Sequence, residues 1–446
     1  EVFMSVIFQL FHAGQWHDAA ELTFTGDEMS SKVRLTYLTD YLFSIADNDC
    51  IDNRACSVNA PLSIIPTDYL KWPALLDDLM PVGKSRSWWL RRLNVAHETP
   101  FKKNIALLKN ACNSPIGNLR VKGHSNKVST NNDVLYFEIN DVVSLQYDFL
   151  EYANEQGATV GGATGAGGVA PKLLLMLVKD KVYIDGDFAG KPLTGIAYLT
   201  KFARNNRQEI DNDILKAEGV YYKVLNQVLD GLSVETMDPS LIKILEHNGQ
   251  VSLWLPRFDI EINNGIAHRL GMESIYSIIN AEPGSVQNHF DVINRLWAKI
   301  SNVTDMSSED FIKQYVARDF LNLIFGNSDN HGRNISFLKK ENKISFAPIY
   351  DFAPMKADPE MVTRLFKWGD GFERGGKVNF LHIAEQLSPM CDPNELIAYL
   401  QEIAKRLKNL PIKLLDAGCP NSIVNFPSIG FEFLESKFVQ MGVMDE

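Results

Sequence analysis

A polar segment near residue 330 carries the side chains that acid–base and metal chemistry require. Residues 326–336, GNSDNHGRNIS, hold an aspartate, a histidine, an arginine and three asparagines within eleven positions. Asp329 and Asn334 form a D-x-x-x-x-N spacing, in which a carboxylate can accept a hydroxyl proton while an amide oxygen binds a metal ion. By itself the segment could equally be a surface turn, since Asn, Asp and Gly are common turn residues.

A second aspartate, Asp351, lies seventeen residues after Asn334. The intervening ISFLKKENKISFAPIYDF predicts a β-hairpin with a polar turn. Such a hairpin would return Asp351 beside Asn334, where the oxygens of both side chains would suit Mg²⁺. Alone, Asp351 could simply cap a turn after the strand, so its weight comes from the polar segment before it.

Three upstream features complete the order in which protein kinases present their phosphate-handling groups. A glycine-rich loop spans 157–168, Lys201 lies in an expected strand, and Glu218 lies in an expected helix. In that order the loop covers the phosphates, the lysine holds them and the glutamate braces the lysine. Singly, they could be a linker, an exposed strand lysine and a surface helix residue, so the joint order carries the hypothesis of phosphoryl transfer.

Other nucleotide-binding motifs fail at particular positions. Lys172 precedes a leucine rather than Ser or Thr, so GGVAPKL is not a Walker A loop. The G-x-G-x-x-A run from Gly165 follows a helix-like segment and leads into an expected hairpin, whereas the dinucleotide motif follows a strand and opens a helix. The sequence also lacks H-E-x-x-H and G-x-S-x-G. A dinucleotide-binding oxidoreductase is therefore disfavoured.

The pattern of elements predicts an α+β chain with three regions. A mixed α/β region, 1–125, opens with an expected pair of strands over 2–25. A strand-rich region, 126–259, contains the glycine loop and the lysine strand. A mostly helical region, 260–446, carries the polar segment. A strand-rich lobe beside a helical lobe forms a cleft, and clefts between domains are favoured ligand sites.

Helical spacing is clearest in the last region. Residues 307–325 begin with the capping signal S-x-x-D and place apolar side chains on one face. Residues 391–411 predict a helix in which Asp392 caps the start, Pro393 suits the first turn and Pro411 ends the helix. Further helices are expected at 72–80, from Trp88 onward, and at 104–111, 142–156 and 213–231.

The composition is that of an ordinary globular protein, and it argues against nucleic acid as a general partner. Of the 446 residues, 45% are hydrophobic and 22% charged, with a formal net charge of −11. A general binder of nucleic acid backbones usually presents a basic surface, so this charge argues against one. The local run KSRSWWLRR at 84–92 is interpreted as an amphipathic helix with a solvated basic face.

Cysteine usage and the first residues predict a cytoplasmic location. The five cysteines are odd in number and contain no C-x-x-C pair, which is typical of a reducing compartment. The first residues lack a basic n-region and an A-x-A site, so no signal peptide is expected. No apolar run reaches about 18 residues, so no membrane span is expected either.

The segments GAGGVAPK, TKF, LPRFD, GNSDNHGRN and IYDF, in this order, resemble the HipA-like serine/threonine kinases of bacterial toxin–antitoxin systems. The resemblance covers most of the chain, and it implies a two-lobed protein-kinase-like fold with an extra N-terminal subdomain. It further implies an ATP- and Mg²⁺-dependent kinase that phosphorylates a cytosolic bacterial protein, such as an aminoacyl-tRNA synthetase, and arrests growth. It also implies a small helix-turn-helix antitoxin as partner, through which alone the chain would reach DNA.

The resemblance implies a role for each matched residue. Asp329 would be the catalytic base, while Asn334 and Asp351 would bind Mg²⁺. Lys201 would hold the α- and β-phosphates, with Glu218 in support. The other nucleotide-binding positions would be Gly167, Gly168, Val169, Ala170, Pro171 and Lys172 in the phosphate loop, Leu255, Pro256, Arg257 and Phe258 beside adenine, His331 and Arg333 at the phosphates, and Gly332 and Tyr350 within the same site.

Two departures from the family pattern support an alternative function. Pro256 stands where an acidic hinge residue is common, and its backbone has no N–H to donate. Some members autophosphorylate a serine in the glycine-rich loop, and the matching position in this chain is Gly165. The nearest hydroxyl is that of Thr164, one residue before it. The alternative is a catalytically weak, nucleotide-gated interaction module that pairs with a DNA-binding antitoxin. The filled base and metal positions oppose it.

Overall fold

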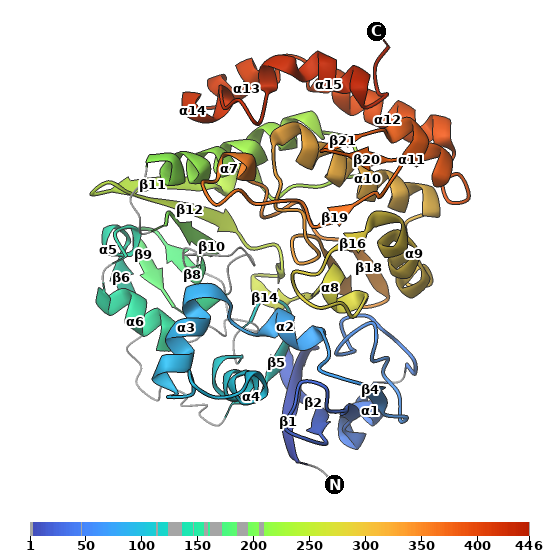
Figure 1. The fold of residues 1–446 in the computed structure, drawn as a ribbon. Coiled ribbons are helices and arrows are strands. Elements are labelled where there is room, and N and C mark those ends of the chain that lie inside the picture. The colour runs from blue at the N-terminus through green and yellow to red at the C-terminus, as the bar shows by residue number, and fades with distance from the viewer. Residues whose placement is uncertain are drawn as a thin grey trace.

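The structure of the chain is a computed structural model. It describes residues 3–45, 47–112, 115–123, 136–145, 147–155, 159–160, 172–184, 195–204 and 209–445. Within these ranges, helices and strands alternate through the first half of the chain, and longer helices dominate the second half (Figure 1). This confirms the expected α+β class.

The N-terminal part is an antiparallel five-stranded sheet with the order β4-β3-β2-β1-β5. Its first two strands form the predicted hairpin, which bulges between Phe8 and Gln9. Apolar side chains of these strands, such as Phe8 and Leu22, are fully buried under the neighbouring helices. The elements are β1 (Met4–His12), β2 (Gln15–Phe24), β3 (Val33–Tyr37), α1 (Thr39–Ser44), β4 (Thr67–Tyr69), α2 (Leu75–Leu79), α3 (Gly83–Arg92), α4 (Pro100–Ala111) and β5 (Leu119–Val121).

The second sheet holds the predicted lysine strand at its centre. Its order is β11-β12-β10-β8-β9-β6, with β7 paired to β8, and all pairings are antiparallel. The strands are β6 (Tyr136–Glu138), β7 (Thr159–Val160), β8 (Lys172–Val178), β9 (Lys181–Tyr183), β10 (Ile196–Phe202), β11 (Lys243–His247) and β12 (Gln250–Pro256). The hairpin β8–β9 turns at residues 179–180, as the sequence predicts.

Helix α7 (Glu209–Val228) covers one face of this sheet and separates it from the C-terminal helices (Figure 1). A Cβ on Gly219 would lie 2.8 Å from Leu253 and 2.9 Å from Ile244, so the helix axis lies close to β11 and β12. The single helix expected over 142–156 is wrong. Leu145 adopts a left-handed φ of 51°, which ends α5 (Ile139–Val143) before α6 (Tyr147–Glu155) begins.

The C-terminal part is mostly helical, with short strands that bring its loops together. Strands β15, β17 and β18 form one sheet, and the predicted hairpin over 336–346 is its β17–β18 pair. The strands are β13 (Ile260–Asn263), β14 (Ile266–Arg269), β15 (Gly271–Ser274), β16 (Gln287–Asn288), β17 (Ser336–Lys340), β18 (Lys343–Phe346), β19 (Phe366–Lys367), β20 (Glu373–Arg374) and β21 (Lys377–Val378). The helices are α8 (Ile275–Ile278), α9 (His289–Ile300), α10 (Ser308–Phe325), α11 (Phe380–Gln386), α12 (Pro393–Arg406), α13 (Leu410–Asp416), α14 (Asn421–Val424) and α15 (Leu434–Gln440), with short 3₁₀ turns at Pro239–Leu241, Met355–Ala357 and Phe431–Phe433.

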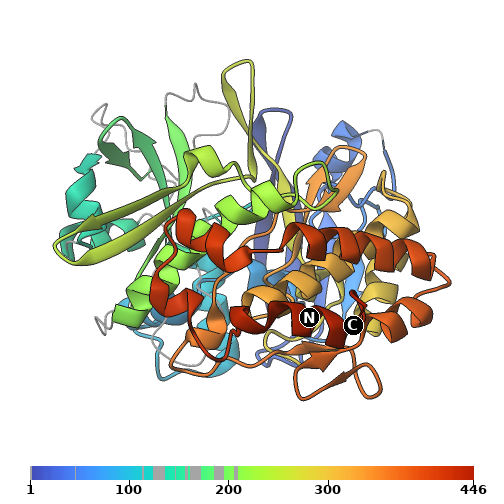
Figure 2. The same cartoon turned by 90° about the horizontal axis from the view of Figure 1, so that it is seen from above.

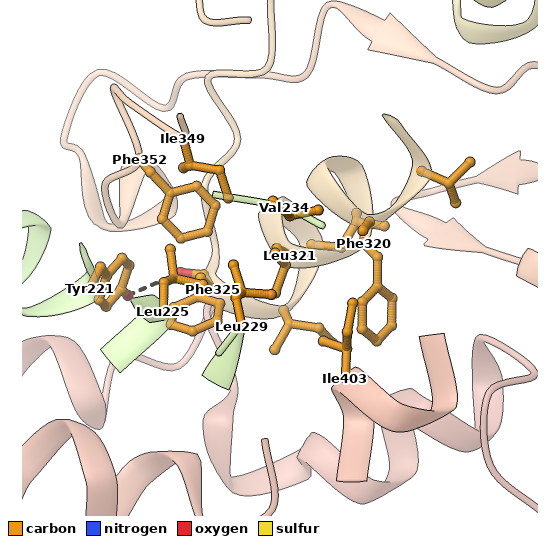
Figure 3. Packing of buried hydrophobic residues seen from close by; sticks show 14 of the residues in the cluster. Tyr221, Leu225, Leu229, Val234, Phe320, Leu321, Phe325, Ile349, Phe352 and Ile403 are labelled. Atoms are coloured by element: carbon orange, nitrogen blue, oxygen red, sulfur yellow. Dashed lines mark hydrogen bonds between the residues drawn. The ribbon is translucent and has the colours of Figure 1, made fainter. Parts of the chain in front are cut away.

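Helix α10 is the central buried helix of the C-terminal part. Ser307 caps it by accepting a hydrogen bond from the backbone N–H of Asp310, and Gly326 ends it with a φ of 72°. The sequence predicts one apolar face, but every residue of α10 from Gln314 to Phe325 is buried. Figure 3 shows why, since side chains of α10 pack between those of α7 and Ile403 of α12.

The predicted role of Pro411 is wrong, although the capping of α12 by Asp392 and the placement of Pro393 are confirmed. Helix α12 ends at Arg406, five residues before Pro411. Asn409 then turns the chain with a left-handed φ of 62°, and Pro411 falls in the first turn of α13. The physical reason is that a proline lacking an N–H suits a helix start as well as it follows a helix end.

The parts pack as two lobes with the N-terminal sheet set beside them. Seen from above, the C-terminal helices cross over α7 while the seven-stranded sheet lies to one side (Figure 2). The residue boundaries 1–125, 126–259 and 260–446 stay predictions. Across the described part of the chain, every helix is too short or too polar to cross a bilayer.

The core around α10 sets the stability of this lobe. Leu321 is 0% exposed and packs against α7 (Figure 3), so we expect Leu321→Ala to lower the unfolding free energy by about 2–5 kcal/mol. Leu70 is 78% exposed, and we expect Leu70→Ala to change it by less than about 0.5 kcal/mol. Urea denaturation followed by circular dichroism measures both, and equal losses would contradict the packing of Leu321 in this core.

Candidate active site

Two cavities meet at Asp351, and most of the predicted site residues that the structure describes line one or both of them. His331 and Gly332 line neither. The first, of about 180 Å³, lies between the end of β12, the loop after α10 and the N-terminal subdomain. It is lined by Leu255, Pro256, Arg257, Phe258, Arg333, Asn334, Tyr350, Asp351, Lys172 and Lys201, among others. The second, of about 140 Å³, is lined by Asp329, Asp351, both lysines and residues of the segment after Asp351.

Buried charges form the wall between these cavities. The Lys201 Nζ atom lies 2.5 Å from Glu218 Oε1 and 2.5 Å from Asp351 Oδ1. The Lys172 Nζ atom lies 2.8 Å from both oxygens of Asp351. Register explains the arrangement, because Lys201 of β10 stands directly opposite Lys172 of β8, so both side chains point to the same face of the sheet.

Burial and the neighbouring charges shift the pKa values of three groups in this cluster, Asp351, Lys201 and Lys172. Burial disfavours the carboxylate of Asp351, but the ammonium groups of Lys172 and Lys201 outweigh it and hold the pKa of Asp351 well below its ordinary value. Burial likewise lowers the pKa of Lys201, yet Asp351 and Glu218 together raise it above the ordinary lysine value. The pKa of Lys172 is lowered, because burial outweighs the attraction of Asp351 and Lys201 repels the charge.

Helix α7 braces the cluster through a second residue that sequence analysis missed. The Tyr222 hydroxyl donates to Glu218 Oε1 at 2.7 Å and accepts from the backbone N–H of Phe352 at 3.1 Å. It therefore ties the residue after Asp351 to the helix that carries the glutamate. Asp351 itself has a left-handed φ of 49°, a conformation that costs about 1–3 kcal/mol for a residue with a side chain. The i, i+4 spacing of Glu218 and Tyr222 is the signal that could have found this contact.

The loop after α10 folds back on itself around Asp329. The Asn334 side chain donates through Nδ2 to the backbone oxygen of Asp329 at 2.7 Å, and its backbone N–H donates to the oxygen of His331 at 3.0 Å. Asn334 lines the first cavity, whereas Asp329 lines the second. The loop thus presents an amide on one side of Asp351 and a carboxylate on the other.

Within this loop, His331 is buried and only 2% exposed. Its ring stacks on Tyr276 at 6.2 Å, and its Nε2 atom lies 3.3 Å from Asp329 Oδ1. Burial lowers the pKa of His331 despite the nearby Asp329, so the ring is neutral at neutral pH. Gly332 must be a glycine, because a Cβ there would meet the ring of Tyr276 at 2.7 Å and that of Phe366 at 2.9 Å.

Arg333 turns toward the N-terminal subdomain, a contact that the sequence does not predict. Its Nε atom lies 3.9 Å from Asp78 Oδ1 of α2, and Asp78 in turn accepts from the backbone N–H and hydroxyl of Ser274 at 3.0 and 2.7 Å. Asp77 beside it also lines the first cavity, and burial raises its pKa to about 6. Nothing local in the sequence signals that residues 77 and 78 reach a loop some 250 positions away.

The chain beside the first cavity is fixed by its own buried pair. Arg257 donates to Asp259 at 2.9 and 2.6 Å, and Asp259 also accepts from the backbone N–H of Gly117 at 2.9 Å. Phe258 packs against Tyr350, with ring centroids 5.8 Å apart, and the Tyr350 hydroxyl donates to the oxygen of Arg333 at 2.6 Å. The predicted Gly167–Pro171 positions (167–171) and Thr164 lie outside the described residues.

The donor atoms at Asp351 and Asn334 fit a small oxygen-binding cation. Asn334 uses Nδ2 in its bond to Asp329, which leaves Oδ1 as its free amide oxygen, and both residues line the first cavity. Mg²⁺ prefers one or two such protein oxygens together with substrate phosphates and water. Among the residues that the structure describes, no group of three or more His, Cys, Asp or Glu side chains is placed to hold a metal ion.

Comparison with known proteins gives a family match and a fold match. A family model described as the HipA-like C-terminal domain matches residues 164–410, more than half of the chain. A chain of the Shewanella oneidensis MR-1 toxin–antitoxin complex of HipA, HipB and operator DNA superposes with a TM-score of 0.62 and 17% identity, covering 98% of this chain and 96% of that one. The fold is therefore the two-lobed, kinase-like α+β fold that the sequence predicts.

Two further similarities are partial. The protein of Sinorhizobium fredii (strain NBRC 101917 / NGR234) named "Putative kinase Y4mE" is 26% identical over 145 residues, which span 30% of this chain and 31% of that protein. The Helicobacter pylori proinflammatory kinase CtkA aligns with a TM-score of 0.38 and 14% identity, covering 63% of this chain and 92% of that one.

The Arg257–Asp259 pair gives the site a defined acid response. Burial acts to raise the pKa of Asp259, but Arg257 outweighs burial and lowers it below the ordinary value near 4. The carboxylate therefore stabilises the fold above about pH 4, and this contribution is lost as the pH falls through the folded-state pKa. We expect Asp259→Asn to lower the unfolding free energy by about 3–5 kcal/mol at neutral pH, and by progressively less in acid.

Urea denaturation at a series of pH values between about 7 and 3 measures this difference. The exposed pair Arg34–Asp68 provides the control, because its side chains are 54% and 55% exposed, and Asp68→Asn should leave the unfolding free energy nearly unchanged. A loss for Asp259→Asn that stays constant, or grows, toward low pH would contradict the assignment.

Proposed function

Because the chain belongs to the HipA-like family, we propose that it is an ATP-dependent protein kinase that transfers phosphate to a serine or threonine of another protein. One observation carries the proposal. Asp351 and two lysines separate a cavity bordered by the end of β12 from a cavity that holds Asp329. A nucleotide on one side and a hydroxyl acceptor on the other would meet at this wall, which is the geometry that in-line phosphoryl transfer requires.

In this proposal each side chain has a separate task. Lys201 holds the α- and β-phosphates and keeps its charge because Glu218 and Asp351 flank it. Asp329 orients the acceptor hydroxyl and takes its proton. Leu255 and Phe258 enclose the adenine, and the Pro256 carbonyl accepts from it although Pro256 has no N–H to give. Arg333 and Lys172 add positive charge beside the phosphates.

Mg²⁺ would be held by Asp351 and Asn334 and would supply charge neutralisation for the phosphates. Lys172 and Lys201 donate to the Asp351 carboxylate and favour its ionised form, which is the form that a cation would bind. The Asn334 side chain is held by its bond to the Asp329 backbone. This bond links the amide that would bind the cation to the residue whose carboxylate would face the acceptor. The protein residues thereby fix both sides of the transfer before a nucleotide binds.

We also propose a partner and a class of substrate. The solved HipA structure is a complex with HipB and operator DNA, so a small helix-turn-helix antitoxin is the partner expected for this chain. The acceptor would be a cytosolic bacterial protein, such as an aminoacyl-tRNA synthetase, whose phosphorylation arrests growth. Purification of a tagged chain together with the product of the neighbouring reading frame tests the partner, and a failure of the two to co-elute would contradict it.

The base assignment has a direct test. We expect Asp329→Asn to reduce phosphate transfer about 10²- to 10⁴-fold, because an amide cannot take the proton of the acceptor hydroxyl. The affinity for ATP should stay unchanged. Labelled phosphate transfer to protein in a bacterial lysate measures the first quantity, and equilibrium binding of ATP with and without Mg²⁺ measures the second. Asp230→Asn, at an exposed position on another part of the surface, is the matched control and should retain full activity.

Two results would contradict the proposal in different ways. Full transfer by Asp329→Asn would remove Asp329 from the base role. Tight ATP binding by the wild-type protein without any transfer would instead favour the nucleotide-gated interaction module, for which the proline at the hinge is the supporting observation.

A further inference from the structure

Asp319 is a buried carboxylate in the middle of α10 and is 3% exposed. Its Oδ1 atom accepts from Arg364 Nη1 at 2.9 Å and from Asn330 Nδ2 at 3.2 Å. Its Oδ2 atom accepts from Arg364 Nη2 at 3.0 Å and from Trp368 Nε1 at 2.8 Å. Four donors on one carboxylate bring together the helix, the loop that follows it and the segment around β19.

The charge of this group is maintained by its partners. Burial acts to raise the pKa of Asp319, but Arg364 and the nearby His289 outweigh burial and lower it well below the ordinary value. Arg364 is held in turn by Glu373, with Nε 2.9 Å from Oε1. Glu373 also accepts from the backbone N–H of Trp368 at 3.0 Å. The cluster is therefore a closed, charged unit inside the lobe.

Asn330 links this unit to the predicted base, since it directly follows Asp329. Its side chain accepts from the backbone N–H of Leu365 at 3.0 Å and donates to the oxygen of Phe366 at 2.8 Å. The backbone N–H of Phe366 donates back to the oxygen of Asn330 at 3.2 Å. The residue next to Asp329 is thus bonded to β19 through both its side chain and its backbone.

Arg364 links the same unit to the acceptor side of the site. The segment 353–363 follows Asp351 and lines the second cavity through Ala353, Asp358 and Glu360. Arg364 directly follows this segment, and its bidentate bond to Asp319 returns the chain to the core. One carboxylate therefore sits between the loop that carries the base and the segment that borders the acceptor cavity.

We propose that Asp319 is a positioning residue for phosphoryl transfer, which acts through Asn330 on Asp329 and through Arg364 on the acceptor-side segment 353–363. The inference rests on the proposed kinase function. It goes beyond that function, because Asp319 lines neither the first cavity nor the second. Asp319 lines a smaller, separate cavity of about 30 Å³ together with Asp329 and Asn334. Displacement of a reacting group by about 1 Å can lower a rate about 100-fold, so loss of this anchor should act on the chemical step rather than on nucleotide binding.

The test compares two buried carboxylates of similar chemistry. Asp319→Asn keeps the size of the side chain and removes its charge. The matched control is Asp52→Asn in the N-terminal subdomain, where Asp52 is 1% exposed and bonds Arg54 at 2.6 and 3.0 Å. Both variants should lose thermal stability, but only Asp319→Asn should lower kcat, by about 100-fold, with the KM for ATP unchanged. Arg364→Lys keeps the charge but loses the bidentate geometry, and it should show a smaller loss of kcat with the same unchanged KM.

Wild-type kcat in Asp319→Asn, or an equal loss of kcat in Asp52→Asn, would overturn the inference. If Asp319→Asn does not fold, Arg364→Lys decides, and wild-type kcat in that variant overturns it. If the wild-type protein shows no transfer, the proposed function fails, and hydrogen exchange of the 327–334 amides reports the anchor instead. Faster exchange in Asp319→Asn or Arg364→Lys but not in Asp52→Asn would support positioning, whereas unchanged exchange would overturn it.

Discussion

The ion cluster around Asp351 is the constraint on which the rest of the site depends. Two ammonium groups and two carboxylates lie within hydrogen-bonding distance of one another in a buried setting, so their charges balance. A buried charge without a partner is strongly unfavourable, so every element that supplies one must arrive in register. The pairing of β8 with β10 brings the two lysines together, α7 brings Glu218, and the chain after the β17–β18 hairpin brings Asp351.

The same cluster explains why the site has two sides. Asp351 sits in a left-handed conformation that Tyr222 and the backbone of Phe352 hold in place, and cavities lie on either side of its carboxylate. The loop after α10 repeats this division, since Asn334 faces one cavity and Asp329 the other. In the proposed function, this charged wall between the two cavities would keep a nucleotide and an acceptor apart except at one point, which is how positioning would contribute to phosphoryl transfer.

Much of this could be predicted from the sequence, and the failures have physical causes. The hairpin before Asp351 and the caps of α10 and α12 follow from local rules, and the pairing of Lys201 with Glu218 follows from the order of charged residues along predicted elements. The predictions of one helix over 142–156 and of a helix that ends at Pro411 were wrong. In each case a single left-handed residue, Leu145 or Asn409, redirects the chain although the apolar periodicity continues. The contact of Asp78 with Arg333 depends on how the N-terminal subdomain docks, and no local pattern encodes that docking.

Helix α10 shows how burial changes a prediction made from the spacing of apolar residues. Its spacing predicts one apolar face and leaves its polar residues to solvent, yet Arg318, Asp319 and Asn322 are all buried. Buried polar groups must be bonded, and these three reach out of the helix to Ala347, to Arg364 and to Asn327. Each of those partners lies in a loop or segment next to the site. The helix therefore does more than support the site from below, because its polar side chains specify where the surrounding loops are held.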